Sequence, residues 1–180
     1  DYQNGIVGGL GAEAEPLLQR AGRALAAARA AGLPVIYVKV CFRPGHPEIG
    51  ERNPAFATAK ESNRYVAGTA EAEIHPAVAP RAGEIVVEKR RVSAFAGSDL
   101  EVILRARRID TLVLCGIATS GVVLSTVRQA ADADYRLVVL ADACGDRDPE
   151  VHRVLTGKVF PRQAEVTSVD EFVGRLQRAK

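Results

Sequence analysis

Four short segments carry polar or reactive side chains at places where a predicted strand ends. They are residues 1–4, residues 41–43, Lys89 with residues 93–95, and residues 115–122. An aspartate such as Asp1 can transfer a proton, and a lysine can hold positive charge beside it. Because the carboxyl ends of parallel strands meet at one edge of a sheet, we expect the four segments to form one site.

Taken singly, each of these features also has a structural explanation. Asp1 could cap a helix, and Lys89 lies in the charged run 88–91, which is typical of a solvated surface. The glycines of residues 116–121 could serve only a tight turn. The convergence of separate segments is therefore the signal that favours a functional site.

Strands and helices alternate along the chain, which predicts an α/β fold. The expected strands are residues 35–40, 84–87, 111–115, 137–141 and an edge strand at 165–167; the expected helices are residues 15–31, 99–108 and 121–134, a short helix from 149 and a terminal helix from 169. This order predicts right-handed crossovers and a three-layer αβα, Rossmann-like domain over residues 1–180, with a central, mostly parallel sheet of about five or six strands. The stretch 41–69 has no clean periodicity, and we expect a functional loop there.

The composition gives no reason to expect nucleic acid or a membrane as a partner. Lys and Arg number 24 against 22 Asp and Glu, so the net charge is only +2. The apolar runs are far shorter than the roughly 20 residues of a membrane span. Three cysteines, Cys41, Cys115 and Cys144, lack the spacing of a disulfide or zinc framework, so we expect a cytoplasmic protein.

The motifs resemble those of the isochorismatase-like hydrolases, a family that includes nicotinamidases and carbamoylsarcosine amidases. Residues 1–4 have the family's Asp-x-Gln-Asn pattern. Lys89 with residues 93–95 and Leu100 resembles the second block, and residues 116–119 with Val123 and Thr126 resemble the third. The order and spacing agree over nearly the whole chain.

The resemblance also implies a missing group. In the family, Asp and Lys act with a Cys in the pattern Gly-x-x-Thr-x-x-Cys-Val, and Gly116 and Thr119 place Val122 at the Cys position. The implied catalytic positions are thus Asp1, Lys89 and Val122. The implied substrate contacts are Gln3, Cys41, Phe42, Arg43, Phe95, Ala118 and Thr119.

Two functions stay open for such a variant. True isochorismatases split a vinyl ether without a covalent intermediate, so the resemblance allows acid-assisted hydrolysis of a small molecule, with Asp1 as proton donor and Lys89 as electrostatic partner. Burial would raise the pKa of Asp1 and Lys89 would oppose this. Backbone N–H groups of residues 118–122 would form an anion site. The alternative is an inactive relative that binds a small molecule or a protein.

Cys41 is the one cysteine that we keep as a replacement nucleophile. It ends a strand that is expected beside Asp1, and a nearby cation, either Arg43 or Lys89, could lower the pKa of its thiol. Cys115 and Cys144 are expected to be packed apolar side chains.

No metal or other cofactor is expected. The three histidines are His46, His75 and His152, and they lack the spacing of a zinc site. Because the family commonly assembles, we expect a homo-oligomer, either a dimer or a tetramer, in which the stretch 41–69 could contribute to an interface as well as to the pocket.

Overall fold

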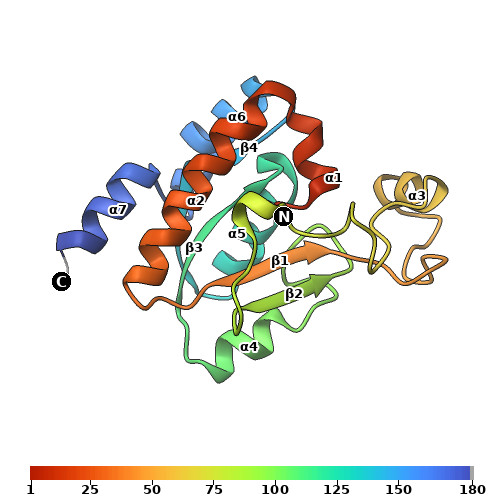
Figure 1. Cartoon of the computed structure of the whole chain (residues 1–180), viewed down its shortest axis with the longest axis horizontal. Helices are drawn as coiled ribbons and strands as arrows, with labels where there is room; N and C mark the ends of the chain where they lie inside the picture. The colour runs from red at the N-terminus through yellow and green to blue at the C-terminus, as the bar shows by residue number, and fades with distance from the viewer. Residues whose placement is uncertain (179–180) are drawn as a thin grey trace.

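Parallel strands lie between layers of helices in the computed structural model, which describes residues 1–178 (Figure 1). β1 (Ile36–Val40) pairs with β2 (Ile85–Lys89), and β4 (Arg136–Gly145) pairs with β3 (Thr111–Ile117) and β5 (Glu165–Thr167). All three pairings are parallel. The predicted three-layer α/β fold is confirmed, although within residues 1–178 the strands form two hydrogen-bonded groups rather than one continuous sheet.

Every expected helix has a counterpart. The α-helices are α1 (Asn4–Val7), α2 (Ala14–Ala30), α3 (Pro54–Glu61), α4 (Leu100–Ala106), α5 (Leu124–Asp132), α6 (Pro149–Val154) and α7 (Val169–Arg178). Short 3-10 or π-helical turns are η1 (Gly8–Glu13), η2 (Pro76–Val78), η3 (Thr119–Val123), η4 (Leu155–Val159) and η5 (Phe160–Arg162). The expected end of the domain, residue 180, lies outside the described residues.

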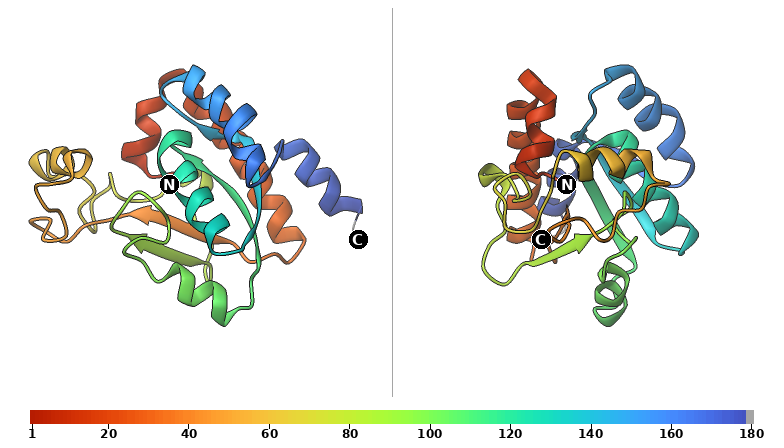
Figure 2. Two further views of the ribbon diagram at one scale, coloured as in Figure 1. Left: turned by 180° about the vertical axis from the view of Figure 1, so that it is seen from behind. Right: turned by 90° about the vertical axis from the view of Figure 1, so that its right-hand side faces the viewer.

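The strand β4 separates two apolar clusters. Leu137 and Val139 are buried with side chains of α4 and α5, whereas Val138 and Leu140 pack with side chains of α2 and α7. Successive side chains of a strand point to opposite faces, so this apolar run fills both clusters. Figure 2 shows the helices of the two layers on opposite sides of the strands.

The stretch 41–69 is more ordered than expected, because it contains α3. Asn53 caps this helix through its side-chain oxygen, which accepts the Phe56 N–H, and Pro54 takes the first helical position. This cap signal is visible in the sequence, and the expectation of an irregular loop over 41–69 was wrong for the residues of α3. The helix projects beyond the carboxyl ends of β1 and β2 (Figure 1).

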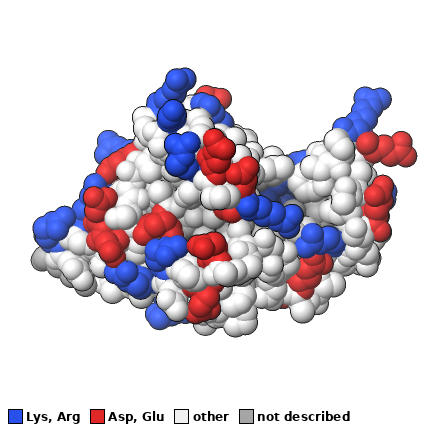
Figure 3. All heavy atoms as spheres, turned by 90° about the horizontal axis from the view of Figure 1, so that it is seen from above, with Lys and Arg blue, Asp and Glu red and all other residues white. Residues whose placement is uncertain are grey.

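Within residues 1–178, no helix is long and apolar enough to cross a membrane. Basic and acidic side chains are mixed on the face drawn in Figure 3, and neither sign forms a broad patch there.

Candidate active site

A cavity of about 370 Å³ lies at the carboxyl ends of four strands. Val40, Lys89 and Ile117 are the last residues of β1, β2 and β3, and Asp146 directly follows β4; all four line the cavity. Asp1 joins them from the start of the chain. This is the edge at which open α/β sheets bind ligands.

Asp1 and Lys89 form a buried ion pair in this cavity. Lys89 Nζ lies 3.0 Å from Asp1 Oδ2, and the two side chains are 3% and 5% exposed. Lys89 Nζ also donates to the Arg91 carbonyl at 3.0 Å. Asp1 Oδ1, in contrast, is buried and has no hydrogen-bond partner among residues 1–178. An unpaired buried acceptor costs about 1–3 kcal/mol, and a ligand that donates a hydrogen bond would remove this cost.

Burial changes the proton affinity of the lysine. It lowers the pKa of Lys89 to about 7. A lysine with this pKa can release and regain a proton near neutral pH, as a group that takes part in acid–base chemistry must. The Asp1–Lys89 pair can therefore carry a transferable proton.

Gly116 allows the close approach of Asp1 to the end of β3. Its φ is 148°, and a Cβ at this position would lie 3.1 Å from the backbone nitrogen of Asp1. A larger residue would be strained in this conformation and would push Asp1 away. Gly116 thus helps to hold Asp1, and with it the Asp1 carboxylate, at the end of β3.

The turn η3 forms one wall of the cavity. Ala118, Ser120 and Val122 line it, and Val122 presents an apolar side chain that is 8% exposed. Two contacts hold the turn. The Ser120 N–H donates to Asp146 Oδ2 at 2.7 Å, and Thr119 Oγ1 lies 2.8 Å from His152 Nδ1.

The expected anion site at residues 118–122 is partly used up within the protein. Besides the Ser120 N–H, which binds Asp146, the Gly121 N–H donates to the Ala118 carbonyl at 3.0 Å. Burial alone would raise the pKa of Asp146, but the hydrogen bonds from Ser120 and from the backbone outweigh it, so its pKa lies below the ordinary value. A carboxylate of the chain therefore occupies a position where a bound anion was expected.

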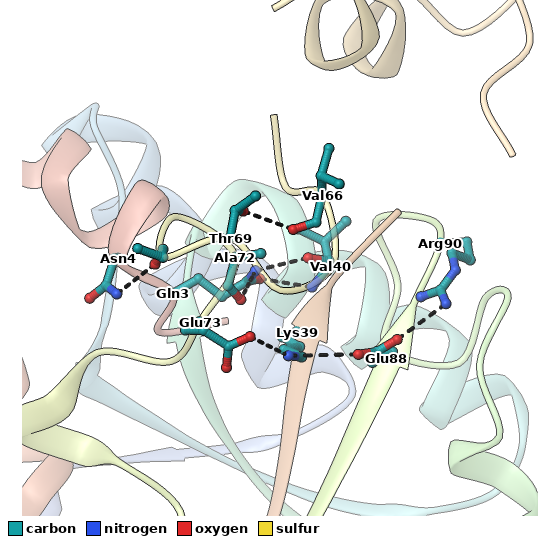
Figure 4. Close-up of polar contacts among 11 residues, drawn as sticks. Gln3, Asn4, Lys39, Val40, Val66, Thr69, Ala72, Glu73, Glu88 and Arg90 are labelled. Atoms are coloured by element: carbon teal, nitrogen blue, oxygen red, sulfur yellow. Dashed lines mark hydrogen bonds and ion pairs between the residues drawn. The ribbon is translucent and has the colours of Figure 1, made fainter. Parts of the chain in front are cut away.

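Gln3, an expected substrate contact, instead connects backbone segments. Its Nε2 donates to the carbonyls of Val40 and Ala72, and its Oε1 accepts the Val40 N–H, each at 2.8 Å (Figure 4). The side chain is fully buried and does not line the cavity. Its polar atoms are already paired, which supports a structural role.

Most of the other expected substrate contacts also lie outside the cavity lining. Ala118 lines the cavity, whereas Cys41, Phe42, Arg43, Phe95 and Thr119 do not. Phe42 and Phe95 are buried in separate apolar clusters. Arg43 has an exposed side chain that pairs with Glu48 at 2.7 Å. These residues therefore support the walls rather than face the cavity.

Cys41 has the wrong surroundings for a nucleophile. It is fully buried, and burial raises the pKa of its thiol; the neighbouring Glu88 adds to this rise, while Lys39 and Arg90 oppose it. A raised pKa keeps the thiol protonated and unreactive. Burial also raises the pKa values of Cys115 and Cys144.

The cavity residues outside the sequence expectations include four with charged or aromatic side chains: Tyr65, Asp146, Arg147 and Phe56. Asp146 and Arg147 follow β4 at its carboxyl end, so the strand-end criterion that identifies Lys89 would also have found them. Tyr65 and Phe56 come from the irregular stretch 41–69 and carry no such signal.

Within residues 1–178, no group of three or more His, Cys, Asp and Glu side chains is placed to hold a metal ion. The three histidines make local contacts. His46 Nε2 lies 2.7 Å from the Arg64 carbonyl, His75 Nδ1 accepts the Ala77 N–H, and His152 meets Thr119.

Comparison with solved structures identifies the class of protein. A cysteine hydrolase from Pseudomonas syringae pv. phaseolicola 1448A matches with a TM-score of 0.85 at 26% identity, over 94% of this chain and 84% of that one. Residues 1–171 match the isochorismatase domain. The chain belongs to the isochorismatase family.

Two relatives illustrate the range of this family. The isochorismatase family protein YecD of Escherichia coli O157:H7 is 36% identical over 98% of this chain and 93% of its own length. The ureidoacrylate amidohydrolase RutB of Methylobacterium radiotolerans is 34% identical over 91% of this chain and 70% of its own.

Proposed function

We propose that this protein hydrolyses a small molecule without a covalent intermediate, with Asp1 as the proton donor and Lys89 as its charged partner. The observation that carries the proposal is the buried Asp1–Lys89 pair, which opens on the cavity and leaves Asp1 Oδ1 without a partner in the described part of the chain.

The proposed mechanism is non-covalent because Val122 stands, by motif register, where the family has its cysteine. The valine side chain has no nucleophilic atom. No cysteine lines the described cavity, and the buried Cys41 thiol has a raised pKa. Water is therefore the nucleophile in this proposal.

The Asp1–Lys89 pair accounts for the protons that move during the proposed hydrolysis. In the reactive form the Asp1 carboxyl group carries a proton and Lys89, with its Nζ 3.0 Å away, keeps its own proton and its positive charge. Asp1 gives a proton to the leaving atom as the scissile bond breaks, and water adds its hydroxide to the carbon. The remaining proton of the water returns to the pair. Lys89 stabilises the negative charge that Asp1 carries in between.

The proposed substrate class is a small acid with a carbamoyl or ureido group. The relative named for ureidoacrylate suggests this class. Arg147 supplies a suitable partner for the carboxylate, because it lines the cavity, is exposed and forms no ion pair with another residue among 1–178. A guanidinium binds a carboxylate through charge-assisted hydrogen bonds.

A second candidate function is ligand binding without turnover. The apolar Val122 favours it, because this side chain fills space at the cavity wall and offers no reactive group. The same pocket would then hold a small acid as a ligand.

A hydrolysis screen separates the two functions. Ureidoacrylate, N-carbamoylglycine and isochorismate would be incubated with the wild type, Asp1→Asn and the control Asp132→Asn, whose exposed carboxylate lies on α5. We expect Asp1→Asn to lower the rate by about 10²- to 10⁴-fold, as for loss of a general acid, and the control to keep it. A wild type that binds these compounds but hydrolyses none would favour the binding function. An active wild type insensitive to Asp1→Asn would refute the mechanism.

A further inference from the structure

Tyr65 holds an unusual backbone conformation at the rim of the cavity. Its φ is 56°, in the left-handed region. Four other non-glycine residues with positive φ occur within residues 1–178, namely His46, Asn63, Arg108 and Asp134, and none of them lines the cavity. A bulky aromatic residue rarely adopts this conformation, and such outliers cluster at ligand sites.

Contacts on both sides keep Tyr65 in this position. The Phe42 N–H donates to its carbonyl at 2.9 Å. The Arg64 guanidinium lies over its ring, 4.7 Å from the centroid, and is itself held by Glu71 at 2.5 Å and by the Gly5 carbonyl at 3.0 Å. The surrounding structure thus fixes the ring despite the unfavourable backbone.

The phenol remains available as a hydrogen-bond donor. Arg64 can donate to this hydroxyl but, as a guanidinium, cannot accept from it, and no other residue among 1–178 accepts the hydroxyl proton. Burial raises the pKa of Tyr65, so the hydroxyl keeps its proton at neutral pH. Arg147 lines the same cavity, and its positive charge acts on this pKa in the opposite direction.

We propose that Tyr65 is a specificity-determining residue that donates its hydroxyl to the carboxylate of a small ureido acid, beside the guanidinium of Arg147. The carbamoyl group of this ligand then lies toward the Asp1–Lys89 pair, and Phe56 and Val92 provide apolar walls of the same cavity. This inference rests on the proposed function for the choice of ligand class, but it requires binding only and no turnover.

Within the described part of the chain, Arg147 is the charged residue of the cavity that is left free for an anionic ligand. Asp1 and Lys89 pair with each other, and the Asp146 carboxylate accepts hydrogen bonds from the backbone N–H groups of Ser120 at 2.7 Å and Asp148 at 3.3 Å. Arg147 makes no ion pair with another residue among 1–178. A donor hydroxyl next to a free guanidinium suits a carboxylate, which can accept from both.

The test compares two probes of similar size. N-carbamoylglycine carries the ureido group and a carboxylate, and ethylurea carries the ureido group alone. Their dissociation constants would be measured by calorimetric titration for the wild type, Tyr65→Phe and Tyr135→Phe. Tyr65→Phe removes only the hydroxyl and keeps the ring under Arg64. Tyr135 is the matched control, since it is half-buried against Phe95 and lies outside the cavity lining.

We expect the wild type to prefer N-carbamoylglycine and Tyr65→Phe to bind it about tenfold more weakly, as for loss of one hydrogen bond to a charged group. Ethylurea binding should stay within twofold in both variants. Equal affinities of Tyr65→Phe and the wild type for N-carbamoylglycine, or a wild type without preference for the acid, would overturn the inference. If Tyr65-dependent binding occurs but no hydrolysis does, the inference stands and the proposed enzymatic function fails.

Discussion

Lys89 Nζ lies 3.0 Å from Asp1 Oδ2, in a pair whose side chains are almost fully withdrawn from solvent. Taking two charges out of water is costly, and their attraction repays this cost only in part. Such a pair is a poor way to gain stability. Its position at the strand ends, open to a cavity, is better explained by chemistry, and it has a measurable consequence for the pH dependence of folding.

Stability should rise with pH because of Lys89. Burial lowers its pKa to about 7 in the folded protein, from 10.5 in the unfolded chain. Between these values the unfolded chain binds the extra proton, so the free energy of unfolding increases with pH, by at most about 1.4 kcal/mol per pH unit. The contribution of neutral Lys89 to the free energy of unfolding is complete above pH 10.5 and is lost as the pH falls to 7. Urea unfolding of the wild type and Lys89→Met between pH 7 and pH 9 measures it.

The control is Lys60→Met, which removes an exposed lysine at the end of α3. It should keep the slope of the wild type, whereas Lys89→Met should lose most of it. Parallel slopes for all three proteins would mean that Lys89 keeps its proton up to high pH in the fold.

Val122→Cys should place a reactive thiol in the cavity. Val122 lines the cavity, whereas its neighbour Val123 is 3% exposed and packs in the apolar cluster beside α5. We expect iodoacetamide to modify Cys in Val122→Cys at least about tenfold faster than in the matched variant Val123→Cys, because access and thiolate character control the rate. Peptide mass spectrometry locates the label. Similar rates at both positions would contradict the geometry of the turn η3, and gain of amide hydrolysis in Val122→Cys would show that the remaining site is competent.

His152 should make the cavity wall sensitive to acid. Burial lowers its pKa from the ordinary value of 6.5, and Asp146 opposes this shift. Because the unfolded chain takes up the proton first, the contribution of His152 to stability is present above about pH 6.5 and is lost as the pH falls through the lower, folded pKa. Nδ1 lies 2.8 Å from Thr119 Oγ1 and can accept this hydroxyl only while it is unprotonated.

Unfolding at pH 7 and pH 5 tests this expectation. His152→Gln should lose less stability on acidification than the wild type, and Arg153→Gln, which changes an exposed neighbour on the same helix, should behave like the wild type. An unchanged acid sensitivity in His152→Gln would show that the histidine does not control this contact.

The alternation of strands and helices along the chain could be read from the sequence, and so could the sheet edge at which the candidate cavity lies, because both depend on local patterns. Apolar strands alternate with helices; Lys89 ends β2, Val122 lies in the turn η3 that follows β3, and Asp1 joins them in the cavity from the start of the chain. The same criterion extends to Asp146 and Arg147 after β4.

No local pattern in the sequence predicts the proposed role of Tyr65. Its left-handed backbone is set by Phe42, which is 23 positions earlier in the chain, and by the position of Arg64 between Glu71 and Gly5. Such long-range contacts exist only after the stretch 41–69 has folded onto the strand ends, so periodicity and composition could not reveal them.

Gln3 offers the clearest test of a structural role against a binding role. Its amide makes three hydrogen bonds of 2.8 Å to the backbone of Val40 and Ala72, and the side chain is fully buried (Figure 4). Gln3→Leu keeps a similar volume but leaves these backbone groups without partners. Each unpaired buried group costs about 1–3 kcal/mol, so we expect the free energy of unfolding to fall by about 2–4 kcal/mol.

The adjacent Asn4 provides the matched control. Its side chain makes a single exposed hydrogen bond, to the Ala70 carbonyl at 2.7 Å, so Asn4→Leu should lower the free energy of unfolding by less than about 1 kcal/mol. Both values would be measured by urea denaturation at pH 8. If Gln3→Leu were as stable as Asn4→Leu and instead lost affinity for N-carbamoylglycine, Gln3 would be a ligand contact, and the amide would have to turn from Val40 toward the cavity when the ligand binds.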